Sequence, residues 1–224
     1  MIRRFALSTL FLFALLAAPF GAAAQGPPVE FEELTMIFEL NETDGDAEVV
    51  MFAQAPEGMT QLTVFGPKGA KRIDLRARGG RDDVGQAEVL LESAEPSVGA
   101  VKKAFPEGEY TFMARTVTGQ RVAGVVTLSH ALLPAPSFSP RDEEVDPDHV
   151  VVSWSPVPGA AAYQVEIEQD EIGANLTVTV GPDVSSLEIP PGFLEPGTEY
   201  EIGVATITPG GNVAVAESSF TTTD

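Results

Sequence analysis

The chain has 224 residues, no cysteine, and 33 Asp and Glu against 13 Lys and Arg, a formal net charge of −20. A surface this acidic repels nucleic acid and anionic lipid, because both bind through Lys and Arg at their phosphates. Without cysteine the chain has no thiol nucleophile, no disulfide and no thioether-bound haem, and we expect no cofactor other than the calcium considered below.

Residues 1–24 have the composition of a secretory signal peptide. Arg3 and Arg4 precede an apolar run, and the small-residue segment Gly21-Ala-Ala-Ala24 satisfies the A-x-A cleavage rule. We predict cleavage before Gln25, which leaves a formal charge of −22 and no membrane span. The alternative is an uncleaved anchor, since the run and its tail are about 20 residues long. The alanine-rich signal is typical of bacteria and predicts a secreted, periplasmic or cell-surface protein.

Residues 25–131 alternate short apolar runs with Gly, Pro, Asn and Asp, which is typical of all-β domains. The predicted strands are 35–40, 47–52, 62–65, 71–75, 110–117 and 121–128, with a short helix within 97–105. The Pro106-Glu-Gly-Glu-Tyr110 segment enters a predicted hairpin and resembles the last two strands of many bacterial immunoglobulin-like domains. We therefore expect an immunoglobulin-like β-sandwich in this half.

Two acidic clusters are candidate calcium sites, because calcium prefers hard oxygen ligands in turns. The first lies in the predicted hairpin turn with Asp44 and Asp46, although its spacing does not fit an EF-hand loop. The second contains Asp142, Asp146 and Asp148, where an ion would stiffen the joint between two domains. The competing interpretation of both clusters is a solvated loop.

A basic cluster stands out against the acidic composition. Six of the 11 Lys and Arg that follow the signal lie between positions 68 and 81. Alternation in the predicted strand places Arg72 and Arg76 on one face, with Lys71 and Arg78 close by. These four residues are the candidate contact for an acidic partner, a polyanionic wall polymer or the acidic domain of another copy. The alternative is an edge strand whose charges prevent aggregation.

The proline-rich segment 132–140 is a predicted linker, and it separates 25–131 from a second domain at 141–224. The strands predicted beyond it are 150–154, 162–168, 175–180, 186–189, 200–207 and 213–220. Their spacing and their aligned apolar faces predict a second β-sandwich.

Three features of this half resemble a fibronectin type III domain, from about residue 134 onward. They are Trp154, Tyr163 and the segment Leu194-Glu-Pro196-Gly-Thr-Glu-Tyr200. The resemblance implies that the Tyr200 hydroxyl bonds to backbone a few residues upstream, so that all five named residues are structural. It also implies adhesion, spacing or attachment to a larger assembly, and it brings no catalytic residues.

Candidate catalytic motifs are missing from the sequence. It has no Gly-x-Ser-x-Gly elbow and no phosphate-binding loop, and its two histidines are His130 and His149. We predict a non-enzymatic, exported binding or adhesion module that recognises a protein or glycan of the envelope or extracellular space. The alternatives are a calcium-stiffened spacer of the envelope, and an accessory subunit or degenerate enzyme. The sequence leaves the oligomeric state open.

Overall fold

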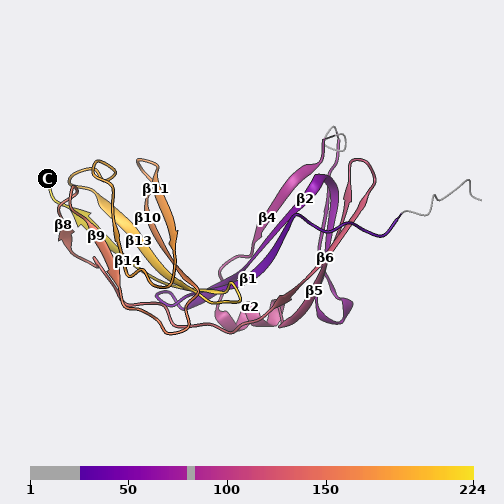
Figure 1. Cartoon of the computed structure of the whole chain (residues 1–224), viewed down its shortest axis with the longest axis horizontal. Helices are drawn as coiled ribbons and strands as arrows, with labels where there is room; N and C mark the ends of the chain where they lie inside the picture. Colours follow the sequence, from indigo (N-terminus) through magenta and orange to yellow (C-terminus); the bar gives the residue numbers. More distant parts are fainter. Residues whose placement is uncertain (1–25, 80–83) are drawn as a thin grey trace, which may run out of the picture.

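The computed structural model describes residues 26–79 and 84–224, which form two arms joined in a V (Figure 1). The predicted signal peptide lies outside the described residues. Apart from one short α-helix and one 3-10 turn, the elements of this part of the chain are strands, so the all-β prediction is confirmed. No helix within the described ranges is long and apolar enough to cross a membrane.

The first arm is built around one long strand, β2. Its elements are β1 (Glu33–Asn41), β2 (Asp46–Phe65), η1 (Pro67–Gly69), β3 (Lys71–Arg76), β4 (Gln86–Glu92), α2 (Val98–Ala104), β5 (Gly108–Thr116) and β6 (Arg121–Leu128). The first half of β2 pairs with β1 and β4, and its second half pairs with β3 and β5. β6 pairs with β5 and completes the arm.

β2 differs from the sequence prediction of two separate strands at 47–52 and 62–65. Pro56 and Gly58 lie between Gln54 and Met59, where the ladder to β4 shifts register, and the ladder to β5 shifts just after them, between Met59 and Gln61. A bulge tolerates a proline that a regular central strand would not, because the bulge interrupts the ladder of hydrogen bonds. The chain therefore passes through this region as one irregular strand.

The first arm has its own core because apolar residues alternate along its strands. In β5, Tyr110 and Phe112 are fully buried, whereas Met113 between inward positions is 46% exposed. Phe38 of β1 and Val49 of β2 are also fully buried in this cluster. β4 was missed by sequence reasoning, because only two of its residues are half-buried and its apolar pattern is weak.

The second arm contains two facing sheets. Its strands are β7 (Phe138–Ser139), β8 (Glu144–Val145), β9 (Val151–Trp154), β10 (Ala162–Gln169), β11 (Ala174–Val180), β12 (Ser186–Glu188), β13 (Glu199–Ile207) and β14 (Val213–Thr222). One sheet has the order β12-β9-β7, and the other contains β11-β10-β13-β14. A second buried cluster, separate from that of the first arm, lies between them.

The aromatic residues of the type III resemblance lie in this second core. The Tyr200 hydroxyl accepts a hydrogen bond from the backbone N–H of Glu195 at 2.8 Å, which is the predicted tyrosine corner. Trp154 and Tyr163 pack with their ring centroids 5.7 Å apart. Leu194 is 4% exposed. The strand order and the tyrosine corner together confirm a fibronectin type III-like second arm.

The arms are joined by more than the chain segment between β6 and β7. β1 pairs in parallel with β14, so one sheet runs through both arms. The side chain of Asn212, in the β13–β14 turn, is 4% exposed and reaches across the joint. Its Oδ1 accepts from Phe38 N at 3.0 Å, and its Nδ2 donates to the carbonyls of Ser129 and Ala131, both at 2.9 Å. This network fixes the β13–β14 turn against the first arm.

Candidate functional site

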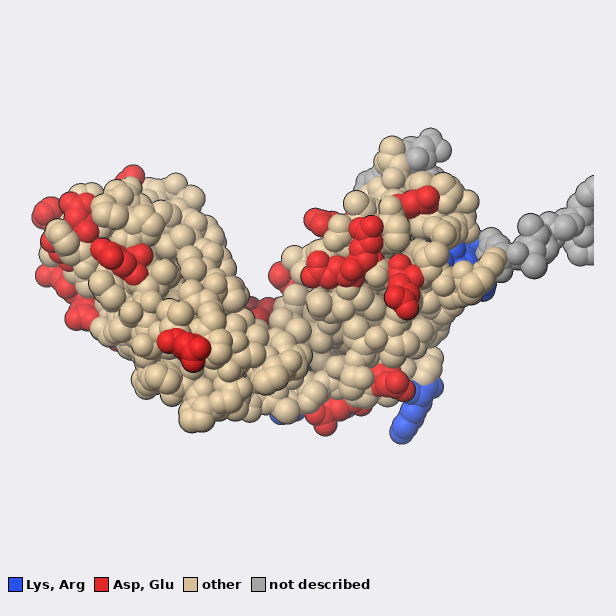
Figure 2. Space-filling view, in the orientation of Figure 1, with Lys and Arg blue, Asp and Glu red and all other residues tan. Residues whose placement is uncertain are grey.

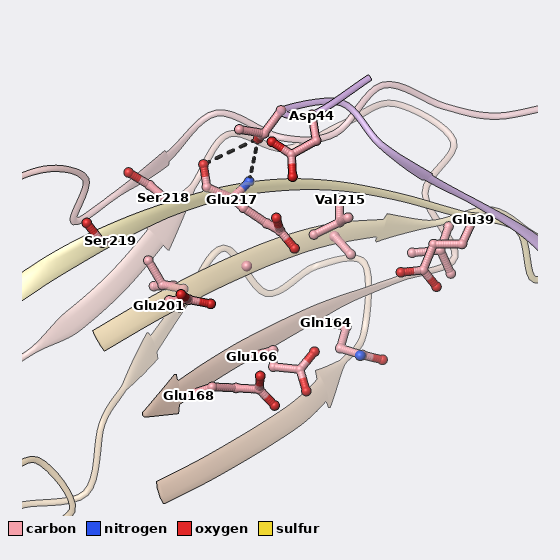
Figure 3. A pocket seen from close by; sticks show the side chains of 15 residues that line it. Glu39, Asp44, Gln164, Glu166, Glu168, Glu201, Val215, Glu217, Ser218 and Ser219 are labelled. Atoms are coloured by element: carbon pink, nitrogen blue, oxygen red, sulfur yellow. Dashed lines mark hydrogen bonds between the residues drawn. The ribbon is translucent and has the colours of Figure 1, made fainter. Parts of the chain in front are cut away.

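A groove of about 430 Å³ lies where the two arms meet. Figure 3 shows carboxylates arranged around it. They come from four strands and one turn: Glu39 (β1), Asp44 (β1–β2 turn), Glu166 and Glu168 (β10), Glu201 (β13) and Glu217 (β14). None of the residues that line the groove in the described chain is Lys or Arg. The groove is therefore a concave surface of one charge sign.

Strand periodicity explains why the second arm contributes its acids. Val165 and Ile167 of β10 are fully buried, so Glu166 and Glu168 project from the opposite face of the sheet, as predicted. Glu201 lies between two buried residues of β13 in the same way. Glu39 joins these acids only because β1 pairs with β14, a contact between residues 174 or more positions apart.

The acids of the joint disfavour one another's ionisation. Burial raises the pKa of Glu39, and the charges of Glu166 and Glu217 raise it further. Burial also raises the pKa of Glu217, although a 2.7 Å hydrogen bond from Asn41 Nδ2 opposes this shift. Beside the groove, burial and the charge of Glu39 raise the pKa of Glu48 to about 7. A positive charge entering this region would relieve the repulsion.

The β1–β2 turn, which contains the first predicted calcium cluster, packs against β14. Thr43 Oγ1 accepts from Glu217 N at 2.8 Å, a bond drawn dashed in Figure 3. Asp44 N donates to Asn41 Oδ1 at 3.2 Å, and the Asp44 carboxylate lines the groove. Asp46 begins β2 opposite Asn41. The turn thus docks one arm on the other.

The second predicted calcium cluster lies in the loops around β8. Asp142 N donates to Ser219 O at 2.7 Å. The Asp146 carboxylate accepts from Asp148 N at 3.0 Å and pairs with His149 Nδ1 at 2.9 Å. Across residues 26–79 and 84–224, no three Asp, Glu or His side chains are arranged to hold a metal ion. Calcium binding by the five aspartates stays a prediction.

The basic strand β3 is exposed, and its charges are partly paired. Lys71 Nζ and Arg76 Nε lie 3.0 and 3.3 Å from Asp74, and their hydrogen bonds lower the pKa of Asp74 to about 2. The predicted shared face of Arg72 and Arg76 is wrong, because the register with β2 shifts at the start of β3. Lys71 shares the face of Arg76, whereas Arg72 lies against Gly66.

The fold adds two cations to the exposed face of the first arm that carries Lys71. Arg115 and Arg121, from β5 and β6, line a hollow of about 300 Å³ with Lys71 and Phe65. Arg78 instead lines a second hollow, between β3 and β4. Sequence reasoning missed Arg115 and Arg121, because only strand pairing brings them beside Lys71. On the face seen in Figure 2, acidic residues are spread over both arms and Lys and Arg are few.

The known structures that are similar to this chain match it weakly. No family model and no curated protein sequence matches the chain. A two-domain fibronectin type III segment of chicken tenascin is 17% identical, covering 84% of this chain and 96% of that one, with a TM-score of 0.33. The FN1–FN3 domains of chicken CNTN1 are 15% identical, covering 88% and 69%, with a TM-score of 0.34.

The third similar structure is the BSP domain of a biofilm-associated protein. It is 18% identical, and the match covers 84% of this chain and 29% of that one with a TM-score of 0.27. TM-scores this low leave the fold to be judged from the chain itself. Its own strand order and the Tyr200 corner show that the second arm is fibronectin type III-like.

Proposed function

We propose that this protein is an exported, non-enzymatic recognition module whose groove binds a cationic segment of a protein partner. The observation that supports this most directly is the groove itself, where two arms contribute carboxylates and no lining residue of the described chain is cationic. A Lys- or Arg-rich segment would stabilise the ionised carboxylates. A neutral glycan carries no charge to do so, and the groove therefore favours a protein.

The joint supports this function because it keeps the groove in one shape. The β1–β14 pairing and the bonds of Asn212 hold both walls before any partner arrives. A preformed surface loses less conformational entropy on binding. These same contacts already join the arms, and for this reason we favour recognition over a calcium-stiffened spacer.

The test is comparative capture from an envelope extract. The wild-type protein, a Glu166→Gln/Glu201→Gln groove variant and a Glu188→Gln control on the other sheet are immobilised in parallel. We expect proteins that the wild type and the control retain, that about 0.5 M salt releases, and that the groove variant loses. Equal retention by the groove variant would exclude the groove as the contact.

A second candidate is an anionic partner on the first arm. Lys71, Arg115 and Arg121 surround an exposed hollow with apolar Phe65 and Met113, a mixture typical of interfaces. The charge reversal Lys71→Glu/Arg115→Glu is expected to abolish capture of acidic partners and to leave groove-dependent capture intact. If the reversal changes neither kind of capture, this face is not a contact.

A further inference from the structure

In the described chain, most strands that pair with one other strand have a feature that prevents a further strand from pairing with their open edge. Charged residues lie on β3 (Lys71, Arg72 and Arg76) and on β4 (Glu88 and Glu92). β6 carries Arg121, and Val29, in the segment before β1, forms a bridge to it. β7 and β8 have two residues each, and β12 has three, including Glu188. Charges, short length and covering segments are the usual protections of an open sheet edge.

β11 is different. It has seven residues, Ala174-Asn-Leu-Thr-Val-Thr-Val180, with no charge and no proline, and among residues 26–79 and 84–224 it pairs only with β10. Figure 1 shows it at the rim of the second arm, on the flank that faces the mouth of the V. Val and Thr have high strand propensity, so this edge is ready to accept another strand. Nothing in its composition discourages such pairing.

The sequence of β11 also complements itself. In an antiparallel pair centred on Thr177, Thr177 faces Thr177, Leu176 faces Val178 and Asn175 faces Thr179. Leu176 and Val178 are half-buried on one face, and Asn175, Thr177 and Thr179 are exposed on the other. Every pair would thus join apolar to apolar or polar to polar, and cross-strand Thr–Thr pairs are favourable.

We propose that the β11 edge binds the β11 edge of a second copy of this chain, antiparallel and centred on Thr177. The contact is isologous, as two-fold dimers require, and it continues the β11-β10-β13-β14 sheet across the axis. The proposal does not depend on the function proposed above.

Charge sets the conditions under which the dimer forms. Glu166 and Glu168 of β10 bond to Thr177 and Asn175. Because these carboxylates reach the side chains of β11, they would lie closer together across the proposed axis than the two β10 strands, which would be about 14 Å apart. Their repulsion is reduced by salt, which screens charges over about 8 Å at physiological ionic strength. The net charge of each copy still opposes association, and added salt therefore strengthens the dimer. Binding of a cationic partner responds to salt in the opposite direction, which separates the two proposals.

Sedimentation equilibrium of the predicted mature chain tests the proposal. One strand pair is smaller than a standard interface, so we expect dissociation in the micromolar range or weaker, with tighter association as salt rises. Thr177→Lys places two lysines opposite each other and is expected to weaken the dimer by about tenfold or more. Ser153→Lys, at an exposed position of β9, is the matched control and is expected to leave it unchanged.

A cysteine probe tests the register, because the chain has no cysteine of its own. Under mild oxidation Thr177→Cys is expected to form a disulfide-linked dimer, since directly opposed Cβ atoms lie about 5 Å apart. Thr179→Cys points to the same face, but its two copies would be about 14 Å apart and are expected to stay unlinked. A wild type that is monomeric at all concentrations and salts, or equal linking of both cysteine variants, would overturn the proposal.

Discussion

The two edges of the type III-like sheet differ in how far the rest of the chain covers them. β14 is covered along its length by other parts of the chain, whereas β11, at the far side of the same sheet, is open. Val and Thr occur in both strands, and the edges differ in which segments of the chain pair with them. The covered edge became the joint between the arms, and the open edge is left for another molecule.

The cover of β14 comes from β1, the β1–β2 turn and residues 142–145. β1 pairs with its first residues, and the β1–β2 turn continues the contact through Thr43. Further along, Asp142 N donates to Ser219 O, and Thr221 N donates to Glu143 O at 3.0 Å. β8 then pairs in parallel at the end of the strand. An edge satisfied in this way by its own chain offers few groups to a partner.

Asn212→Ala should have the largest effect, because it removes three hydrogen bonds and leaves buried backbone groups without partners. We expect a loss of about 3 kcal/mol of unfolding free energy, measured by urea denaturation. Asn175→Ala on the open edge is the control and should cost less than about 0.5 kcal/mol, since its position is exposed. Similar losses would mean that the covered edge is no more stable than the open one.

Glu48→Gln tests how much the repulsion among the acids at the covered edge destabilises the folded protein. The folded pKa of Glu48, about 7, exceeds its ordinary value of 4.5, so the folded state holds the proton more tightly. The tighter binding of this proton stabilises the folded state. The stabilisation is fully present below pH 4.5 and is lost as pH rises towards 7.

At pH 8 we expect Glu48→Gln to be more stable than the wild type by about 1 kcal/mol, a value reduced for solvent screening. At pH 4 the two proteins should unfold alike. Glu88→Gln, at an exposed site on β4, serves as the control in the same urea titrations. A constant difference between Glu48→Gln and wild type from pH 4 to pH 8 would contradict the proposed titration.

Thr43→Ala should have a smaller effect, because its bonds to Glu217 lie at the exposed end of the joint. We expect a loss of about 0.5–1 kcal/mol by urea denaturation. The paired change Thr177→Ala on the open edge should cost less in the monomer. A greater loss at Thr177 would reverse the comparison between the edges.

Calcium should have the smallest effect. The arms are joined through β1 and Asn212, and the described residues contain no three carboxylates or histidines arranged for a metal. We expect the melting midpoint to be the same in calcium and in chelator. A clear rise with calcium, lost in Asp146→Asn, would instead support the spacer hypothesis.

The sequence by itself determined the two β-sandwich cores and the tyrosine corner. Residues such as Tyr163, Val165 and Ile167 alternate with Glu166 and Glu168, and a strand with this period has one possible inner face. The Leu194 to Tyr200 spacing is local in the same sense, since the Tyr200 hydroxyl reaches only five residues back. The sequence pattern predicts these features because each of them depends on residues that are close together in the chain.

The joint and the groove were decided by the tertiary structure alone. Glu39 and Glu217 line the same groove, and Asn212 bonds to Phe38. The residues of each pair are 174 or more positions apart in the sequence, and no periodicity links residues so distant. The bulge that separates Arg72 from the face of Arg76 likewise depends on the partner strand β2. The openness of β11 has the same origin. Its composition is written in the sequence, but only the assembled sheet shows that no other segment of the described chain covers it.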